Sequence, residues 1–240
     1  MKQTIKRLLP PTLFLLTAIA VTILVPLRTV TDTGAEQRKE QEQRKSLLLA
    51  EGDYLISPYD KIFRRIGRRH GVDWRLMSAI AYGESNFRAD AVSPRGAVGL
   101  MQVMPWIARS FGVEQELLLD PEVNIDVAAR LLKSMERSLR LPHGTQKRDR
   151  LAFMLASYNC GASRIIDARS LAKYYEEDSL SWEIIAKYLE LLDEEEYYNH
   201  EAVTYGKFRE AEVTIYYVEK VLKCYDRYRR IGKKDSDVTL

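Results

Sequence analysis

Residues 79–105, AIAYGESNFRADAVSPRGAVGLMQVMP, form the segment best suited to chemistry. Met77, Ile80 and Glu84 are spaced by three and four, so they share one face of a predicted helix, whose end Gly83 is expected to mark. Because that face is otherwise apolar, the Glu84 carboxyl is withdrawn from water, which raises its pKa above the ordinary value of about 4.3. A carboxylic acid that is protonated near neutral pH can protonate a glycosidic oxygen. The alternative is a half-exposed glutamate near a helix end without a chemical role.

The stretch that follows, SPRGAVGLMQVMP, combines turn-forming residues with one amide in an apolar run. Gly96 and Gly99 allow the backbone to approach a ligand closely. Gln102 offers donors and acceptors, which suits the hydroxyl and N-acetyl groups of a sugar. Met101 and Met104 are more typical of core packing than of substrate contact. One interpretation of this segment is therefore a sugar-binding loop.

The elements that must position these residues have helical periodicity, and no run shows sustained two-residue alternation. Asp73, Asp120 and Ser181 are expected to cap helices at their N-termini, and Gly161 is expected to end one. The predicted helices are VDWRLMSAIAYGE, PEVNIDVAARLLKSMERSL, RDRLAFMLASYN, WEIIAKYLELL and a long final helix from about 210 to 230. The pattern predicts an all-α fold with short loops.

Composition and charge exclude several classes of protein. The chain has 240 residues with 37 basic and 34 acidic side chains, for a net charge of +3, and it is 46% hydrophobic and 30% charged. These values exclude collagen-like, mucin-like and wholly disordered chains. Basic and acidic residues are interleaved, so no nucleic-acid partner is expected.

The N-terminus has the pattern of a targeting segment. Lys2, Lys6 and Arg7 precede an uncharged stretch from Leu8 to Leu27, a length between that of a signal peptide and that of a membrane span. We predict an uncleaved signal anchor, with a cleaved signal as the alternative, and both send the rest of the chain outward. The expected organisation is a signal-anchor segment at 1–28, a charged linker at 29–57, a helical domain at 58–232 and a polar tail at 233–240.

Three motifs in order resemble those of a known family. ESNFRADAVSPRGAVGLMQVMP resembles the lytic transglycosylases with a goose-lysozyme-like (SLT) domain, whose pattern is Glu-Ser followed by Ser-Pro-x-Gly-x-x-Gly-Leu-Met-Gln-x-Met-Pro. SYNCG at 157–161 is similar to the family's Ala-Tyr-Asn-x-Gly, and YYVEKV at 216–221 is similar to its late Tyr-Val motif. The stretch EEYYNHEAVTYGKFREAE looks most like the catalytic domain of the membrane-bound F group. The resemblance covers about 58–230 and implies a lysozyme-like fold.

The resemblance also implies roles for individual residues. Glu84 matches the catalytic acid, which then acts as a base. Substrate-binding roles are implied for Ser93, Gln102, Met104, Tyr158, Asn159 and Tyr217. Two departures stand out, because Ser157 replaces the usual Ala and one residue is inserted in the late motif. The register of Tyr216 and Tyr217 is therefore ambiguous, and Tyr217 is chosen because Val218 follows it.

The resemblance implies cleavage of the β-1,4 bond between N-acetylmuramic acid and N-acetylglucosamine in peptidoglycan. The segment offers one convincing carboxyl, because Asp90 lies among polar residues, so the substrate's own C6 hydroxyl is expected to close on C1 and give a 1,6-anhydro product. The alternatives are a hydrolytic lysozyme-type muramidase and a non-catalytic, membrane-tethered peptidoglycan-binding module. We expect a periplasmic enzyme of the cell envelope, of Gram-negative type, with peptidoglycan and the membrane as partners.

No cofactor or metal is expected, because His70, His143 and His200 lack ligand spacing. Cys160 and Cys224 either form a disulfide or stay as buried thiols. The basic cluster KIFRRIGRRH at 61–70 is interpreted as a solvated helix face, with attraction to anionic lipid or to acidic groups of peptidoglycan as the alternative.

Overall fold

The computed structural model describes residues 55–234, with side chains through residue 231. The predicted anchor and most of the predicted linker and tail lie outside these residues. Within the described range the elements are α2 (Asp60–His70), α3 (Trp74–Ser85), α4 (Pro105–Ser110), the 3-10 helix η1 (Gln115–Leu119), α5 (Pro121–Leu139), α6 (Lys147–Cys160), α7 (Ala162–Tyr174), α8 (Trp182–Leu191), α9 (Glu195–Tyr198) and α10 (Ala211–Lys234). The all-α prediction is confirmed for this part of the chain. None of its helices is both long and apolar enough to cross a membrane.

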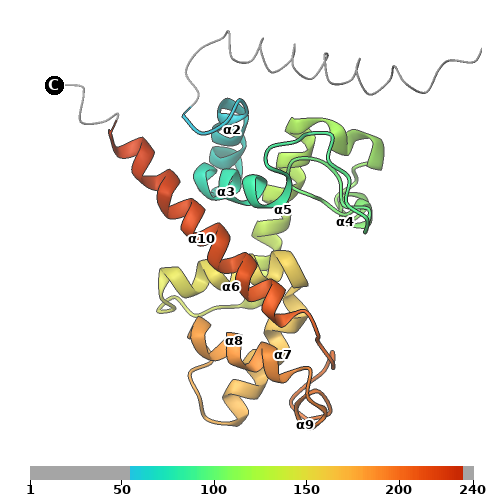
Figure 1. Ribbon diagram of the computed structural model, residues 1–240, viewed down its shortest axis with the longest axis vertical. Helices are drawn as coiled ribbons and strands as arrows, with labels where there is room; N and C mark the ends of the chain where they lie inside the picture. The colour runs from blue at the N-terminus through green and yellow to red at the C-terminus, as the bar shows by residue number, and fades with distance from the viewer. Residues whose placement is uncertain (1–54, 235–240) are drawn as a thin grey trace, which may run out of the picture. The chain divides into compact units, whose positions relative to one another are not determined.

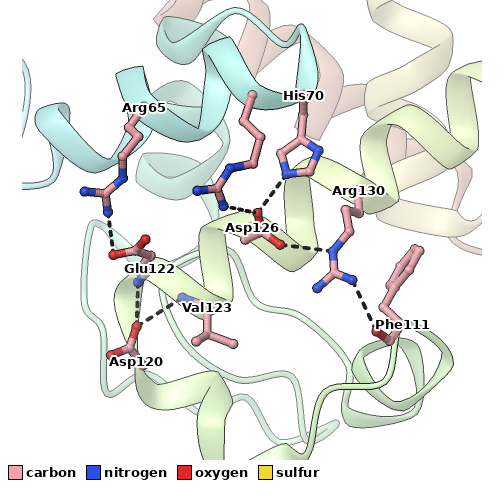
Figure 2. Close-up of polar contacts among 9 residues, drawn as sticks. Arg65, His70, Phe111, Asp120, Glu122, Val123, Asp126 and Arg130 are labelled. Atoms are coloured by element: carbon pink, nitrogen blue, oxygen red, sulfur yellow. Dashed lines mark hydrogen bonds and ion pairs between the residues drawn. The ribbon is translucent and has the colours of Figure 1, made fainter.

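The helix starts show which capping predictions hold. The Asp73 carboxylate accepts a hydrogen bond from the backbone N–H of Arg75 at the start of α3. Asp120 accepts two backbone N–H bonds at the start of α5 (Figure 2). Ser181 occupies the predicted N-cap position of α8, but its side chain makes no capping bond, and Asp149 of α6 accepts the backbone N–H of Trp182 instead.

Helix α3 extends beyond the predicted end at Gly83. It continues to Ser85, and Asn86 ends it in the left-handed conformation with φ 53°. Gly83 has another role, because a Cβ placed there would lie 3.2 Å from Cγ2 of Val221 on α10. The glycine therefore lets α10 approach α3 closely, and Glu84 lies within the last helical turn.

The long helix α10 packs on α3, α6 and α8, and Figure 1 shows it running beside all three. Its apolar face carries Val218 and Val221, both fully buried. They belong to one core with Ile80 of α3 and Phe153 of α6. Burial of one such side chain contributes roughly 1.5–3 kcal/mol, so the core holds the helix of Glu84 firmly against α10.

The segment between α3 and α4 is irregular and is held from α5. Fully buried Asn124 donates from Nδ2 to the carbonyls of Val98 and Leu118 and accepts from the N–H of Met101. Gly99 has a φ of +79°, and a Cβ there would lie 2.5 Å from Asn124 Nδ2. The sequence predicts that Gly99 lets the backbone approach a ligand, but the close approach that it permits is to Asn124 of α5, and this contact fixes the loop beside Glu84.

Candidate active site

The Glu84 carboxyl lies in an open pocket of about 500 Å³ at the end of α3. The other residues that line it are Tyr82, Gly83, Ser85, Asn86, Arg88 and Lys220. Among the described residues, Glu84 is the one carboxyl group in this lining. Asp90, the other acid of the motif segment, is exposed. The pocket therefore presents one acid next to cationic and neutral side chains.

Burial raises the pKa of Glu84 from 4.5 to about 7, although a hydrogen bond from Tyr217 and the charge of Lys220 both act to lower it. The Tyr217 hydroxyl donates to Oε1 of Glu84 at 2.7 Å. Because desolvation outweighs both opposing influences, a large fraction of Glu84 is protonated at neutral pH. This is the environment that the apolar helix face predicts.

The late tyrosine that contacts Glu84 is Tyr217. Its neighbour Tyr216 is 67% exposed. On a helix, consecutive residues point about 100° apart, so the two tyrosines cannot share one partner. The tyrosine that contacts Glu84 is therefore Tyr217, which directly precedes Val218.

Two partly buried tyrosines flank the site. Tyr158 of α6 donates its hydroxyl to the carbonyl of Met101 at 2.6 Å, which ties the irregular loop to α6. Burial and the charge of Glu84 raise the pKa of Tyr158 and of Tyr217 well above the ordinary value. Both phenols therefore stay neutral and act as hydrogen-bond donors.

Several loop residues bind the loop itself. Ser85 donates its hydroxyl to the carbonyl of Leu100 at 2.8 Å, and Ser93 accepts from the backbone N–H of Ala97. Gln102, with a φ of 48°, donates from Nε2 to the carbonyls of Ala91 and Gly99. The donor end of Gln102 is thus engaged in the loop. Met104 is half-buried and precedes α4.

One face of α10 continues along the site. Thr214 donates to Oδ1 of Asn159, an exposed residue near the end of α6. Thr214 lies one turn before Tyr217, so Asn159 and Glu84 are both bonded to this face. Arg95 of the irregular loop forms an ion pair with Glu210, which directly precedes α10.

The disulfide alternative for the two cysteines is wrong. Both are free thiols, with Cys224 buried. Cys160 lies against Thr214, and Cys224 is ten residues further along α10, about 15 Å away at 1.5 Å per residue. A disulfide needs Cα atoms within about 7 Å.

His70 and His200 have partners in the described part of the chain. His70 contacts Asp126 through Nε2 at 2.7 Å, so it is paired instead of free at the surface as its loop-like sequence predicts. His200 accepts the N–H of Ala202 and packs against Tyr174. Among residues 55–234, no group of three or more His, Cys, Asp or Glu side chains is placed to hold a metal ion.

Sequence reasoning missed Asn124, Lys220 and the Arg95–Glu210 pair. A signal for Asn124 exists, because it lies three and four residues before Val127 and Ala128 on a buried face. A polar residue there must find partners, and its partners are the loop carbonyls. No local pattern marks the other residues, whose partners are distant in the sequence.

Comparisons with known proteins agree with this geometry. Residues 61–181 match the family described as Transglycosylase SLT domain. "Membrane-bound lytic murein transglycosylase F" of Marinobacter nauticus is 35% identical over 178 residues, covering 74% of this chain and 34% of that protein. The protein of the same name from Cronobacter sakazakii is 37% identical over 152 residues, covering 63% and 28%.

The chain spans about a third of the length of these curated relatives. The crystal structure of the 70 kDa soluble lytic transglycosylase SLT70 from Escherichia coli superposes with a TM-score of 0.51 at 24% identity, covering 73% of this chain and 24% of that one. This likeness shows a shared fold. By the family match, which covers half of its residues, the chain belongs to the transglycosylase SLT domain family.

Proposed function

We propose that this chain is a lytic transglycosylase of peptidoglycan. It cleaves the β-1,4 bond between N-acetylmuramic acid and N-acetylglucosamine and forms 1,6-anhydro-N-acetylmuramic acid. The observation that carries the proposal is the one acid that lines the pocket: Glu84 has a pKa raised to about 7 and accepts a hydrogen bond from Tyr217. Such a group can give a proton at neutral pH and take one back.

The reaction needs no second protein carboxylate. Protonated Glu84 donates to the glycosidic oxygen as its bond to C1 of the muramic residue breaks, and the bonding electrons leave with that oxygen. The resulting carboxylate takes the proton of the muramic C6 hydroxyl, whose oxygen bonds to C1. Glu84 ends as it began, protonated, and no water is consumed.

The lining of the pocket supports this over ordinary hydrolysis. Most glycosidases place two carboxyl groups about 5–9.5 Å apart across the bond. Glu84 is the one carboxyl of the pocket among the described residues. A nucleophile supplied by the substrate therefore fits this site better than a second acid.

Six residues are proposed to bind or frame the glycan strand. Exposed Asn159 presents its amide beside the α10 face, where Thr214 orients it. Tyr217 holds the acid, and Tyr158 holds the loop through Met101. The proposed set is Ser93, Gln102, Met104, Tyr158, Asn159 and Tyr217.

The cell envelope is the proposed location. The relatives at 35% and 37% identity are named as membrane-bound enzymes. We place the catalytic domain at residues 58–232 in the periplasm, anchored by residues 1–28 through the linker at 29–57. The partners are then the membrane and the glycan strands, and no nucleic acid.

Mass analysis of the products tests this function. Purified sacculi are digested with the wild-type chain and with Glu84→Gln, which keeps the shape and removes the transferable proton. We expect soluble fragments that end in an anhydro sugar, one water lighter than a reducing end, from the wild type alone. Reducing ends would identify a hydrolytic muramidase. Binding to sacculi without release would identify a non-catalytic module, and near-wild-type turnover by Glu84→Gln would refute the mechanism.

A further inference from the structure

The basic cluster on α2 divides into two faces. Arg65 pairs with Glu122, and Arg69 and His70 contact Asp126, so this face is neutralised by α5 (Figure 2). A second pair of arginines, Arg64 and Arg68, is spaced by four and shares another face. That face does not meet α5; it lines a pocket.

The pocket has a volume of about 340 Å³ and lies where α2 turns into α3. The residues that line it are Arg64, Gly67, Arg68, Gly71, Val72, Asp73 and Trp74. A Cβ at Gly67 would lie 2.6 Å from the carbonyl oxygen of Val72 and 3.3 Å from Cβ of Trp74. Because Gly67 has no side chain, the turn closes against α2 and brings Trp74 beside the arginines.

Two donors at this place lack acceptors. The Nε groups of Arg64 and Arg75 are buried without a hydrogen-bond partner. Both guanidinium groups lie over the ring of Trp74, at 4.4 and 5.2 Å from its centroid. Arg75 lies outside the pocket lining and has Asp73 within 3.9 Å, but Arg64 is part of the lining. A buried donor left unpaired costs about 1–3 kcal/mol, so the Nε group of Arg64 indicates that an acceptor from outside the chain completes the site.

The carboxylate in the pocket lining is already engaged. Asp73 accepts the backbone N–H of Arg75 through Oδ1 and the hydroxyl of Tyr225 through Oδ2. Its bonds hold the helix start and α10 together. The lining therefore combines two guanidinium groups with one carboxylate that is occupied elsewhere, and it carries net positive charge.

We propose that this pocket binds a phosphate group, with Arg64 and Arg68 as its cationic donors and Trp74 as the wall that orients them. Guanidinium groups bind phosphate oxygens through paired N–H donors. Several phosphate oxygens can serve two arginines at once. The source is either the headgroup of an anionic phospholipid or a soluble phosphate ester, and the site is separate from the pocket of Glu84.

Arginine Nε–H resonances of the full chain test the proposal directly. The chain is held in dodecyl maltoside in phosphate-free buffer, and the Arg64 and Arg75 signals are assigned with Arg64→Lys and Arg75→Lys. Inorganic phosphate is then titrated. We expect a saturable shift of both signals, with an affinity at least tenfold weaker in the double variant Arg64→Gln with Arg68→Gln.

A matched double variant separates the site from general charge. Arg65→Gln with Arg69→Gln removes the same charge from the same helix on the face toward α5. It should change the phosphate affinity less than twofold, with thermal melts showing that both double variants are folded. An equal loss in both, or no saturable shift in the wild type, would overturn the proposal.

Lipid nanodiscs identify the source. If the headgroup is the ligand, nanodiscs that contain phosphatidylglycerol shift the Arg64 and Arg75 signals, and discs of phosphatidylcholine alone do not. If free phosphate shifts them and neither disc does, the ligand is a soluble phosphate ester. Shifts of the same size in both discs would contradict selective binding of an anionic group.

Discussion

Glu84 and Asp126 are two carboxyl groups of one helical domain with opposite chemistry. Burial raises the pKa of Glu84 to about 7 against the weaker influence of Tyr217 and Lys220. Partial burial would also raise the pKa of Asp126, but its hydrogen bond and ion pair with His70, together with the charges of Arg130 and Arg69, outweigh burial and lower it. Figure 2 shows His70 and Arg130 converging on Asp126 from α2 and α5.

The difference has two causes, because Glu84 is the more deeply buried group and Asp126 has the stronger partners. Glu84 has only a neutral phenol at 2.7 Å and an exposed lysine to favour its charged form, and burial outweighs both, so its proton is retained. Asp126 has the His70 imidazole at 2.7 Å and the guanidinium groups of Arg130 and Arg69 at 3.0 and 3.3 Å, so its charge is retained. A carboxyl surrounded by cations ties helices together, whereas one among neutral groups can exchange a proton.

The largest expected effect is on activity. Glu84→Gln and Asp126→Asn are the same chemical change at the two positions. Loss of a general acid lowers the rate by about 10²–10⁴-fold, whereas Asp126→Asn should stay within a few-fold because it touches no part of the pocket. Release of anhydro-muropeptides from sacculi measures both. Equal losses of activity in the two variants would contradict a catalytic role for Glu84 that Asp126 lacks.

The second effect is on stability, because Glu84→Gln should increase the free energy of unfolding. Glu84 has a pKa of about 7 in the fold and 4.5 without burial. The folded state thus binds the proton more tightly, and stability falls as pH rises from 4.5 to 7. The glutamine avoids this loss, which is worth about 3 kcal/mol at pH 8 and almost nothing at pH 4. Urea unfolding at both values checks it, and a variant less stable than wild type at pH 8 would refute the buried acid.

Removing the hydroxyl of Tyr217 should widen the difference in pKa between Glu84 and Asp126. Tyr217→Phe deletes the hydrogen bond that favours ionised Glu84, so the pKa of Glu84 rises further. We expect turnover to fall about 10–100-fold because the acid loses its orientation, while the alkaline limb of the pH profile moves above 7. Tyr216→Phe is the matched control on an exposed neighbour and should change neither. An alkaline limb that moved downward would contradict the hydrogen bond.

The sequence predicts the Glu84 environment better than the Asp126 environment. Met77, Ile80 and Glu84 share a helix face by spacing alone, and an acid on an apolar face must be desolvated. Arg130 is four residues from Asp126 on α5, but Arg69 and His70 of α2 are more than fifty residues away from it. Local periodicity does not contain that pairing, so it requires the fold.

Helix bounds show the same limit. Asp73 and Asp120 cap helices as predicted because a cap needs only its own neighbours. Gly83 fails as a stop signal because its partner, Val221, lies at the far end of the chain. Gly99 likewise serves the approach of Asn124. A glycine required by distant packing has the same sequence appearance as one required by a turn.

The next effect is a loss of stability at Asp126. The charge of this carboxylate stabilises the fold above its ordinary pKa of 3.8, and this contribution disappears as pH falls below that value. Asp126→Asn should cost about 1–2 kcal/mol at pH 7 and progressively less as pH falls below 3.8 toward the lowered pKa of the folded state, the reverse of the trend for Glu84→Gln. Glu122→Gln, in an exposed pair with Arg65, should cost less than about 0.5 kcal/mol. Equal losses of stability in Asp126→Asn and Glu122→Gln would show that the contacts of Asp126 contribute no more than an exposed ion pair.

The smallest effect is that of Lys220, which acts on Glu84 through its charge alone. Lys220→Met keeps most of the apolar stem and removes that charge, so the pKa of Glu84 rises, by less than in Tyr217→Phe, and turnover stays within a few-fold. Because Lys220 is exposed, salt screens it. Raising the ionic strength should therefore move the alkaline limb of the wild type upward toward that of Lys220→Met, and should leave the variant unmoved. Lys220→Arg, which retains the charge, should follow the wild type. If the alkaline limb of the pH profile of Lys220→Met still moved with salt, cations other than Lys220 would act on Glu84. The contrast with Asp126 would then depend on burial alone.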